Sequence, residues 1–106
     1  MRWLYIFKIL LFHLAFGFKP REYVTKKVGS SFLNIEWDRF SDNETYQVWY
    51  WPLDNASKAK SLSVNLNSVF LRHLISGQTY NIWIIAMTNS NMSSGYLTFQ
   101  QSTGSL

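Results

Sequence analysis

The feature that most constrains this chain is the stretch from Ser68 to Met87, which breaks at Ser76-Gly77 and resumes at Tyr80 as a strict alternation. Side chains of a β-strand point to opposite faces with a period of two, so alternate residues form two series. One series can face a core while the other faces outward. The inward series is Tyr80, Ile82, Ile84 and Ala86, and the outward series is Asn81, Trp83, Ile85 and Met87.

The turn before this strand carries the pattern Leu74-x-x-Gly77-x-x-Tyr80. Glycine adopts positive φ at little steric cost. A tyrosine at the entry to a strand buries its ring while its hydroxyl bonds to the upstream backbone, which is the tyrosine corner of Greek-key sandwiches. The pattern predicts a structural role for Leu74, Gly77 and Tyr80. On this stretch alone, a generic strand–turn–strand with an incidental tyrosine is the alternative.

The rest of the chain after residue 18 reads as short apolar–polar alternations separated by polar turns, with no helical periodicity. Seven such segments at spacings of about 8–12 residues predict an all-β fold, a seven-stranded antiparallel Greek-key sandwich with Trp37 in its core. The length fits a single domain, expected over residues 18–106. The expected strands are 23–28, 33–37, 46–51, 61–67, 69–74, 80–88 and 96–100.

Residues 1–17 are typical of a signal peptide, with Arg2 before an apolar stretch and small residues at Ala15 and Gly17. Lys8 interrupts the apolar stretch, and an uncleaved membrane anchor is the alternative, although a spanning helix needs about 20 apolar residues. Membrane association is expected only if this segment is retained. Removal of residues 1–17 lowers the formal net charge from +4 to +2, because two of the ten basic residues are lost.

Three Asn-x-Ser/Thr sequons favour export independently, at Asn43, Asn55 and Asn91. Each has a middle residue other than proline and falls in a polar stretch between apolar runs, where a glycan fits a surface loop. The motif is short, and one instance would carry little weight. Three instances in expected loops favour a secreted, N-glycosylated protein.

Four motifs follow one another along the chain: Leu33-x-Ile35-x-Trp37, Tyr46-x-Val48-x-Tyr50, Leu74-x-x-Gly77-x-x-Tyr80-x-Ile82-x-Ile84-x-Ala86, and a last strand followed by Thr103. In order and spacing, these motifs resemble a fibronectin type III domain over residues 20–104. Ser76 stands where the family usually has proline, the loop 89–94 lacks Arg-Gly-Asp, and the Trp-Ser-x-Trp-Ser signature of cytokine receptors is missing. The plan of a leader plus one domain also resembles the small fibronectin type III antigens secreted by tapeworm larvae.

Composition and motifs argue against several function classes. The absence of cysteine excludes disulfide frameworks and thiol nucleophiles, and the modest, scattered basic charge disfavours nucleic-acid binding. His73 has no partnered nucleophile, and Glu36 and Asp38, two apart on one strand face, are better explained as a solvated ion-pair face beside Arg39. We therefore expect no enzyme activity, no catalytic residues, no metal and no cofactor.

Partner binding is the function that the pattern favours. The resemblance implies that Trp49, Trp51, Trp83 and Ile85 lie together on the outer face of one sheet, where a large exposed apolar patch marks an interaction site. The expected partner is an extracellular protein, in adhesion or as a host-facing antigen, with weak self-association as a further expectation. Two alternatives stay open. The aromatic side chains of this face only stabilise the sheet by cross-strand pairing or are covered by the chain itself, for instance by the basic segment 19–27; or the domain is a structural spacer from a larger receptor.

Overall fold

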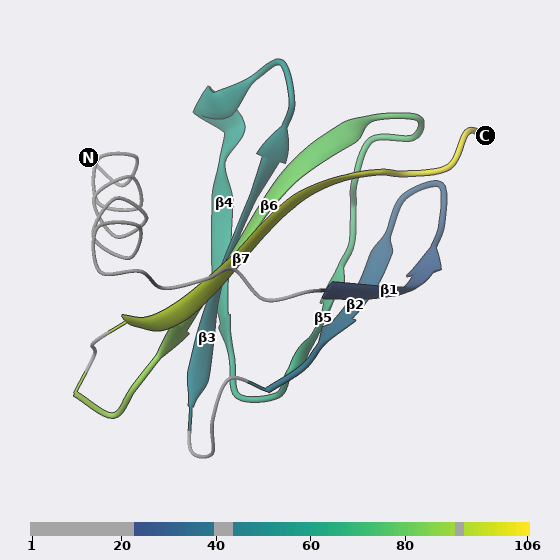
Figure 1. Cartoon of the computed structure of the whole chain (residues 1–106). Coiled ribbons are helices and arrows are strands. Elements are labelled where there is room, and N and C mark those ends of the chain that lie inside the picture. The colour runs from purple at the N-terminus through teal and green to yellow at the C-terminus, as the bar shows by residue number, and fades with distance from the viewer. Residues whose placement is uncertain (1–22, 40–43, 91–92) are drawn as a thin grey trace.

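The computed structural model describes residues 23–39, 44–90 and 93–106, which form two antiparallel sheets (Figure 1). The expected signal segment, residues 1–17, lies outside the described residues. The smaller sheet has the order β1-β2-β5, with β1 (Tyr23–Val28), β2 (Leu33–Trp37) and β5 (Ser68–Leu71). The larger sheet has the order β4-β3-β6-β7, with β4 (Lys60–Val64), β3 (Thr45–Pro52), β6 (Thr79–Met87) and β7 (Ser93–Ser102), and a 3₁₀ turn η1 (Ala56–Lys58) precedes β4.

The core lies between the two sheets and is built from the inward series of each strand. Trp37 is 1% exposed, and its ring meets that of Tyr46 edge to face, with 5.2 Å between the ring centroids. The all-β sandwich, its seven strands and the core position of Trp37 are therefore confirmed. The buried core residues are Leu33, Ile35, Trp37, Tyr46, Val48, Val69, Leu71, Leu74, Tyr80, Ile82, Ile84, Ala86 and Leu97.

The turn between β5 and β6 is the predicted tyrosine corner. Gly77 has a φ of 67°, and the phenolic oxygen of Tyr80 accepts a hydrogen bond from the backbone N–H of Ile75 at 2.9 Å. The Thr103 hydroxyl donates to the Ile75 carbonyl at 2.6 Å and accepts from the Gln78 N–H at 3.1 Å. The corner thus joins the sheets at one end, and the chain after β7 is bonded into it.

Two strands end earlier than the alternation predicts. The expected strand 61–67 places Leu66 in line with Leu62 and Val64, pointing inward, but β4 ends at Val64 and Leu66 is 63% exposed. The cause is Asn67, whose side-chain amide donates to the Trp37 carbonyl while its own carbonyl accepts from the Trp37 N–H. These bonds turn the chain between β4 and β5 and leave Leu66 outside.

The fifth strand was expected to run from 69 to 74, but β5 ends at Leu71. His73, placed inside the expected strand, instead follows β5 with a φ of 61° and an exposed side chain, so it does not continue the alternation that ends at Leu71. Leu74 returns to the core at 8% exposure, and its N–H bonds to the Ser31 carbonyl. The left-handed backbone at His73 makes this change of direction possible.

Within the described ranges, no helix is long and apolar enough to cross a membrane.

Candidate interaction surface

The predicted outer face exists and is formed by β3 and β6, which are neighbours as expected. Their register places Trp49 opposite Trp83 and Gln47 opposite Ile85. Because Val48 and Ile84 on the same two strands are fully buried in the core, the alternating residues point to the other side of the sheet. The four residues predicted for partner binding are therefore on one face.

Trp49, Trp51 and Ile85 form an apolar cluster separate from the core, with Trp83 packed against it; we call this the outer-face cluster. The Trp51 and Trp83 rings meet edge to face at 5.2 Å between centroids, with an interplanar angle of 74°. This is a favoured arrangement of aromatic rings. Ala59 and Met87 pack at the margin of the cluster.

The outer-face cluster is not open to solvent, which contradicts the expected exposure. Trp49 and Trp51 are each 6% exposed and Ile85 is 1% exposed, while Trp83 is half-buried. Strand alternation indicates the face to which a side chain points but carries no information on whether that face is covered. The prediction of an exposed apolar patch is therefore wrong for these three side chains.

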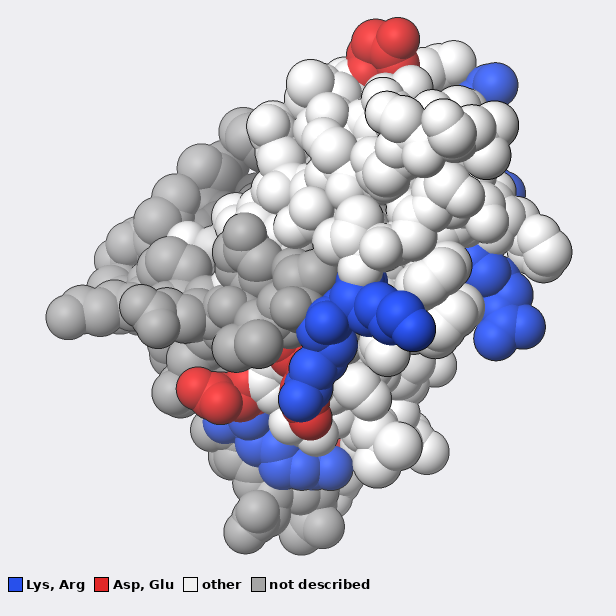
Figure 2. All heavy atoms as spheres, turned by 90° about the vertical axis from the view of Figure 1, so that its right-hand side faces the viewer, with Lys and Arg blue, Asp and Glu red and all other residues white. Residues whose placement is uncertain are grey.

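The basic segment considered as a cover does not lie there in its described part. Lys26 and Lys27 belong to β1 in the other sheet, and Lys26 Nζ lies 2.8 Å from Glu36 Oε1. This hydrogen bond, together with the carboxylate charge, raises the pKa of Lys26. The face shown in Figure 2 accordingly carries Lys and Arg side chains next to Asp and Glu side chains, rather than a basic patch of the kind that binds nucleic acid.

Tyr96 is a member of this face that the sequence analysis missed. It lies on β7 opposite Ile85 and is 5% exposed. The signal was present in the sequence, because Tyr96 begins the last alternation and an antiparallel β6–β7 pairing places it beside the outward residues of β6. The register of the β6–β7 pairing, which places Tyr96 opposite Ile85, could not be obtained from the alternation.

The residues considered for catalysis are not brought together. Glu36 pairs with Lys26, and Asp38 is exposed. His73 follows β5 near the Leu33 end of β2, away from Glu36. Across the described residues, no group of three or more His, Asp or Glu side chains could hold a metal ion.

Of the three sequons, only Asn55 lies within the described residues; Asn43 and Asn91 lie outside them. Asn55 is half-buried in the turn after β3, and its N–H bonds to the Pro52 carbonyl. The Ser57 hydroxyl of the same sequon donates to the Asn55 Oδ1. The sequon therefore occupies a surface turn, as predicted.

No protein-family model matches the chain, and the comparison with curated proteins found no match. Solved structures do match. An fn3 domain of the human collagen α-1(XX) chain superposes with a TM-score of 0.72 at 17% identity, covering 82% of this chain and 85% of that one.

Two further structures are similar. A β-sandwich protein redesigned by computer gives a TM-score of 0.69 at 21% identity, covering 83% of this chain and 97% of that one. The FN1–FN3 domains of chicken CNTN1 give 0.63 at 24% identity, covering 80% of this chain and 30% of that one. These likenesses show that the chain has the fold of a fibronectin type III domain, and they give no support to the narrower tapeworm likeness.

Proposed function

We propose that this protein is a secreted, N-glycosylated, non-catalytic interaction module that binds an extracellular protein through the outer-face cluster of Trp49, Trp51, Trp83 and Ile85. The module would act either in adhesion or as a host-facing surface antigen. A secreted antigen of the tapeworm type is a more specific version of the second role.

One observation carries the proposal: a second apolar cluster on the side of the larger sheet that faces away from the core. A two-layer sandwich buries only its inner faces between the sheets. Aromatic side chains on an outer face therefore serve something other than the core, and tryptophan is enriched among residues that dominate binding energy. Three tryptophans on two adjacent strands match that composition.

The outer-face cluster would act in the secreted form of the protein. A signal peptide over residues 1–17 gives a secreted chain that begins at residue 18, and the sequons at Asn43, Asn55 and Asn91 are its glycan sites. The proposal requires the outer-face cluster to be accessible in the secreted protein.

The burial of the same cluster favours a second candidate, a structural spacer module. A face without a partner site is expected to be buried, and Trp49 is 6% exposed and Ile85 1% exposed. A spacer remains a monodisperse monomer at high concentration, and its outer face stays protected in the secreted form.

The experiment begins with protein recovered from culture medium, because mass spectrometry of that material gives its N-terminus and its glycans. An N-terminus at residue 18 and glycan mass on the sequon peptides are expected; an intact residue 1 and unmodified asparagines would contradict secretion and glycosylation.

The secreted protein is then assayed for self-association by sedimentation and for binding to immobilised extracellular-matrix protein. The double variant Trp49→Ser/Trp83→Ser is expected to lose association and keep the β-sheet circular dichroism spectrum. Gln47→Ser, on the same face of β3, is the matched control and is expected to bind as the wild type does. Association that is unchanged in the double variant would contradict the proposed surface.

A further inference from the structure

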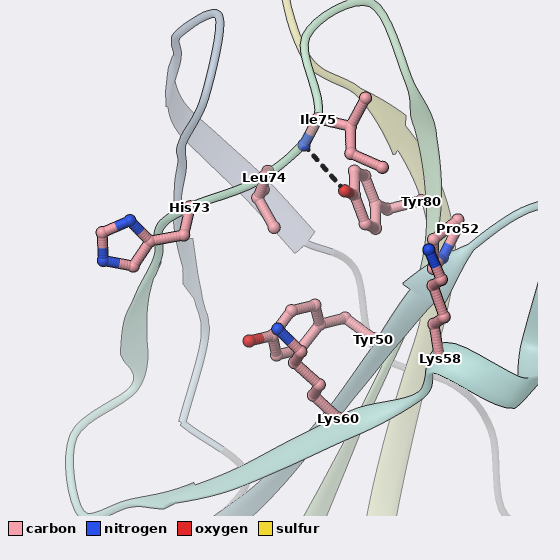
Figure 3. Close-up of a pocket in the computed structure, with 8 residues that line it drawn as sticks. All are labelled: Tyr50, Pro52, Lys58, Lys60, His73, Leu74, Ile75 and Tyr80. Carbon is pink, nitrogen blue, oxygen red and sulfur yellow. Dashed lines mark hydrogen bonds between the residues drawn. The ribbon is translucent and has the colours of Figure 1, made fainter.

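A pocket of about 170 Å³ opens at the end of the sandwich where the tyrosine corner faces the start of β4. This volume is smaller than the roughly 300–1,000 Å³ of pockets that hold drug-sized ligands, so it suits a single ring or a short chain. Figure 3 shows its walls converging from β3, β4 and the turn between β5 and β6. The lining residues are Tyr50, Pro52, Lys58, Lys60, His73, Leu74, Ile75 and Tyr80.

Two lysines give the pocket a positive rim. Lys60 is opposite Tyr50 in the register of β3 and β4, and it shares the inward face of β4 with Leu62. Figure 3 draws Lys60 on the Tyr50 side of the pocket and Lys58 on the Pro52 side. Within the described part of the chain, no carboxylate forms an ion pair with either lysine. Both lysines are exposed, and a cation without a protein counter-ion is available to form a charge-assisted hydrogen bond with an anion.

The Tyr50 hydroxyl adds a neutral donor. It points into the pocket beneath Leu74 (Figure 3). Burial, and secondarily the neighbouring Tyr80, raise the pKa of Tyr50 above its ordinary value, so this phenol keeps its proton at neutral pH. The Tyr80 phenol is already used, because its oxygen accepts the Ile75 N–H.

The remaining residues around the pocket are His73, which lies outside the charged rim, and apolar side chains that form the walls. His73 is not part of the charged rim, because its imidazole points away from the other lining side chains (Figure 3). Leu74, Ile75, Pro52 and the Tyr80 ring supply apolar walls. A neighbouring hollow shares Lys58 and contains Asp54, whose carboxylate disfavours a second anionic group there.

We propose that this pocket binds one carboxylate carried on a single aromatic ring or a short apolar chain. The carboxylate accepts hydrogen bonds from Lys60 and from the Tyr50 hydroxyl, Lys58 adds positive charge from the Pro52 side of the pocket, and the apolar body packs on Leu74 and Pro52. This site is on a different face from the outer-face cluster and stands independently of the function proposed above.

The test is a titration of the ¹⁵N-labelled full chain with phenylacetate, followed by two-dimensional NMR. Saturable shifts confined to the lining residues are expected, with at least a tenfold weaker affinity in Lys58→Gln/Lys60→Gln. Tyr50→Phe is expected to weaken binding by a smaller factor. Lys26→Gln removes a lysine from the other sheet and is the matched control, expected to bind as the wild type does.

Two further probes separate charge from shape. Phenylacetamide, the neutral analogue, is expected not to bind, and acetate, which lacks the ring, is expected to bind at least tenfold more weakly than phenylacetate. No saturable shift with phenylacetate would overturn the proposal, as would unchanged affinity in the double lysine variant. Equal binding of acetate and phenylacetate would show that the apolar walls take no part, which also overturns it.

Discussion

The phenolic oxygen of Tyr80 accepts the backbone N–H of Ile75 across 2.9 Å, while the Tyr80 side chain is only 4% exposed. The bond spans the chain segment that leaves β5 in the smaller sheet and enters β6 in the larger one. The Thr103 hydroxyl donates to the carbonyl of the same residue. Both backbone polar groups of Ile75, its N–H and its carbonyl, are therefore hydrogen-bonded to side chains. This corner fixes how the two sheets meet.

Replacing Tyr80 by phenylalanine tests that role. The ring stays in the core, but the Ile75 N–H loses its acceptor in a part-buried site, and an unsatisfied buried donor costs about 1–3 kcal/mol. Urea unfolding is expected to show a lower midpoint with an unchanged slope. Tyr80→Phe stability equal to the wild type would mean that the hydroxyl bond does not stabilise the corner.

Residue 29 is glycine because the Phe32 ring leaves no space for a Cβ atom there. A Cβ at residue 29 would lie 2.0 Å from Phe32 Cε1, so Gly29→Ala must displace a ring that stacks on Phe70 at 5.1 Å between centroids. Overpacking of this kind costs about 1–3 kcal/mol. The free energy of unfolding is therefore expected to fall in Gly29→Ala and to recover in part when Phe32→Ala is added.

The control for this prediction is Gly104→Ala, where the nearest atoms to an added Cβ are 3.7 Å away. It is expected to change the free energy of unfolding by less than about 0.5 kcal/mol. Similar losses at Gly29 and Gly104 would show that general glycine replacement, and not the Phe32 ring, causes the effect.

Alanine variants at Leu33 and Leu66 test whether β4 ends before residue 66. Leu33 is 0% exposed in the core, whereas Leu66 is 63% exposed after the strand. Leu33→Ala is expected to cost about 2–5 kcal/mol of unfolding free energy, and Leu66→Ala about 0.5 kcal/mol or less. Thermal unfolding of both variants measures the difference. A large loss in Leu66→Ala would instead place residue 66 in the core, as the sequence alternation predicted.

Stability is expected to fall at alkaline pH in part through Tyr50. Its folded pKa is raised, by burial first and by Tyr80 second, so the folded state holds this proton more tightly than the unfolded state does. The resulting stability is present below the unfolded value of about 10 and is lost as pH rises through the folded pKa. Tyr50→Phe is expected to flatten the decline in melting temperature above pH 10, and an unchanged decline would contradict this.

Much of this fold could be predicted from the sequence because each feature has a local cause. The alternation from Tyr80 to Ala86 places four residues in the core, and Gly77 takes the positive φ that its turn requires. The early ends of β4 and β5 could not be predicted in the same way. The end of β4 depends on bonds between Asn67 and Trp37, thirty residues apart in the chain, which no local pattern contains. The end of β5 depends on the left-handed backbone at His73, a conformation that the residue type does not predict.

The outer-face cluster was predictable in position but not in exposure. Period-two alternation and the pairing of β3 with β6 determine that Trp49 and Trp83 share a face. Solvent access depends on what lies over that face, which is a tertiary property. The pocket lined by Lys60 was missed for a different reason. The expected strand began at residue 61 and left Lys60 out, although the alternation with Leu62 and Val64 places Lys60 on the inward side of β4.

Hydroxyl-radical footprinting of the secreted protein tests the central claim most directly, because it reports tryptophan accessibility residue by residue. Trp37, buried in the core at 1% exposure, is the internal reference. If the outer-face cluster is an interaction surface, Trp49, Trp51 and Trp83 will be oxidised much faster than Trp37 in the monomer that begins at residue 18. They will become as protected as Trp37 once the protein associates. Protection equal to that of Trp37 in the secreted monomer itself would contradict the claim and establish the spacer instead.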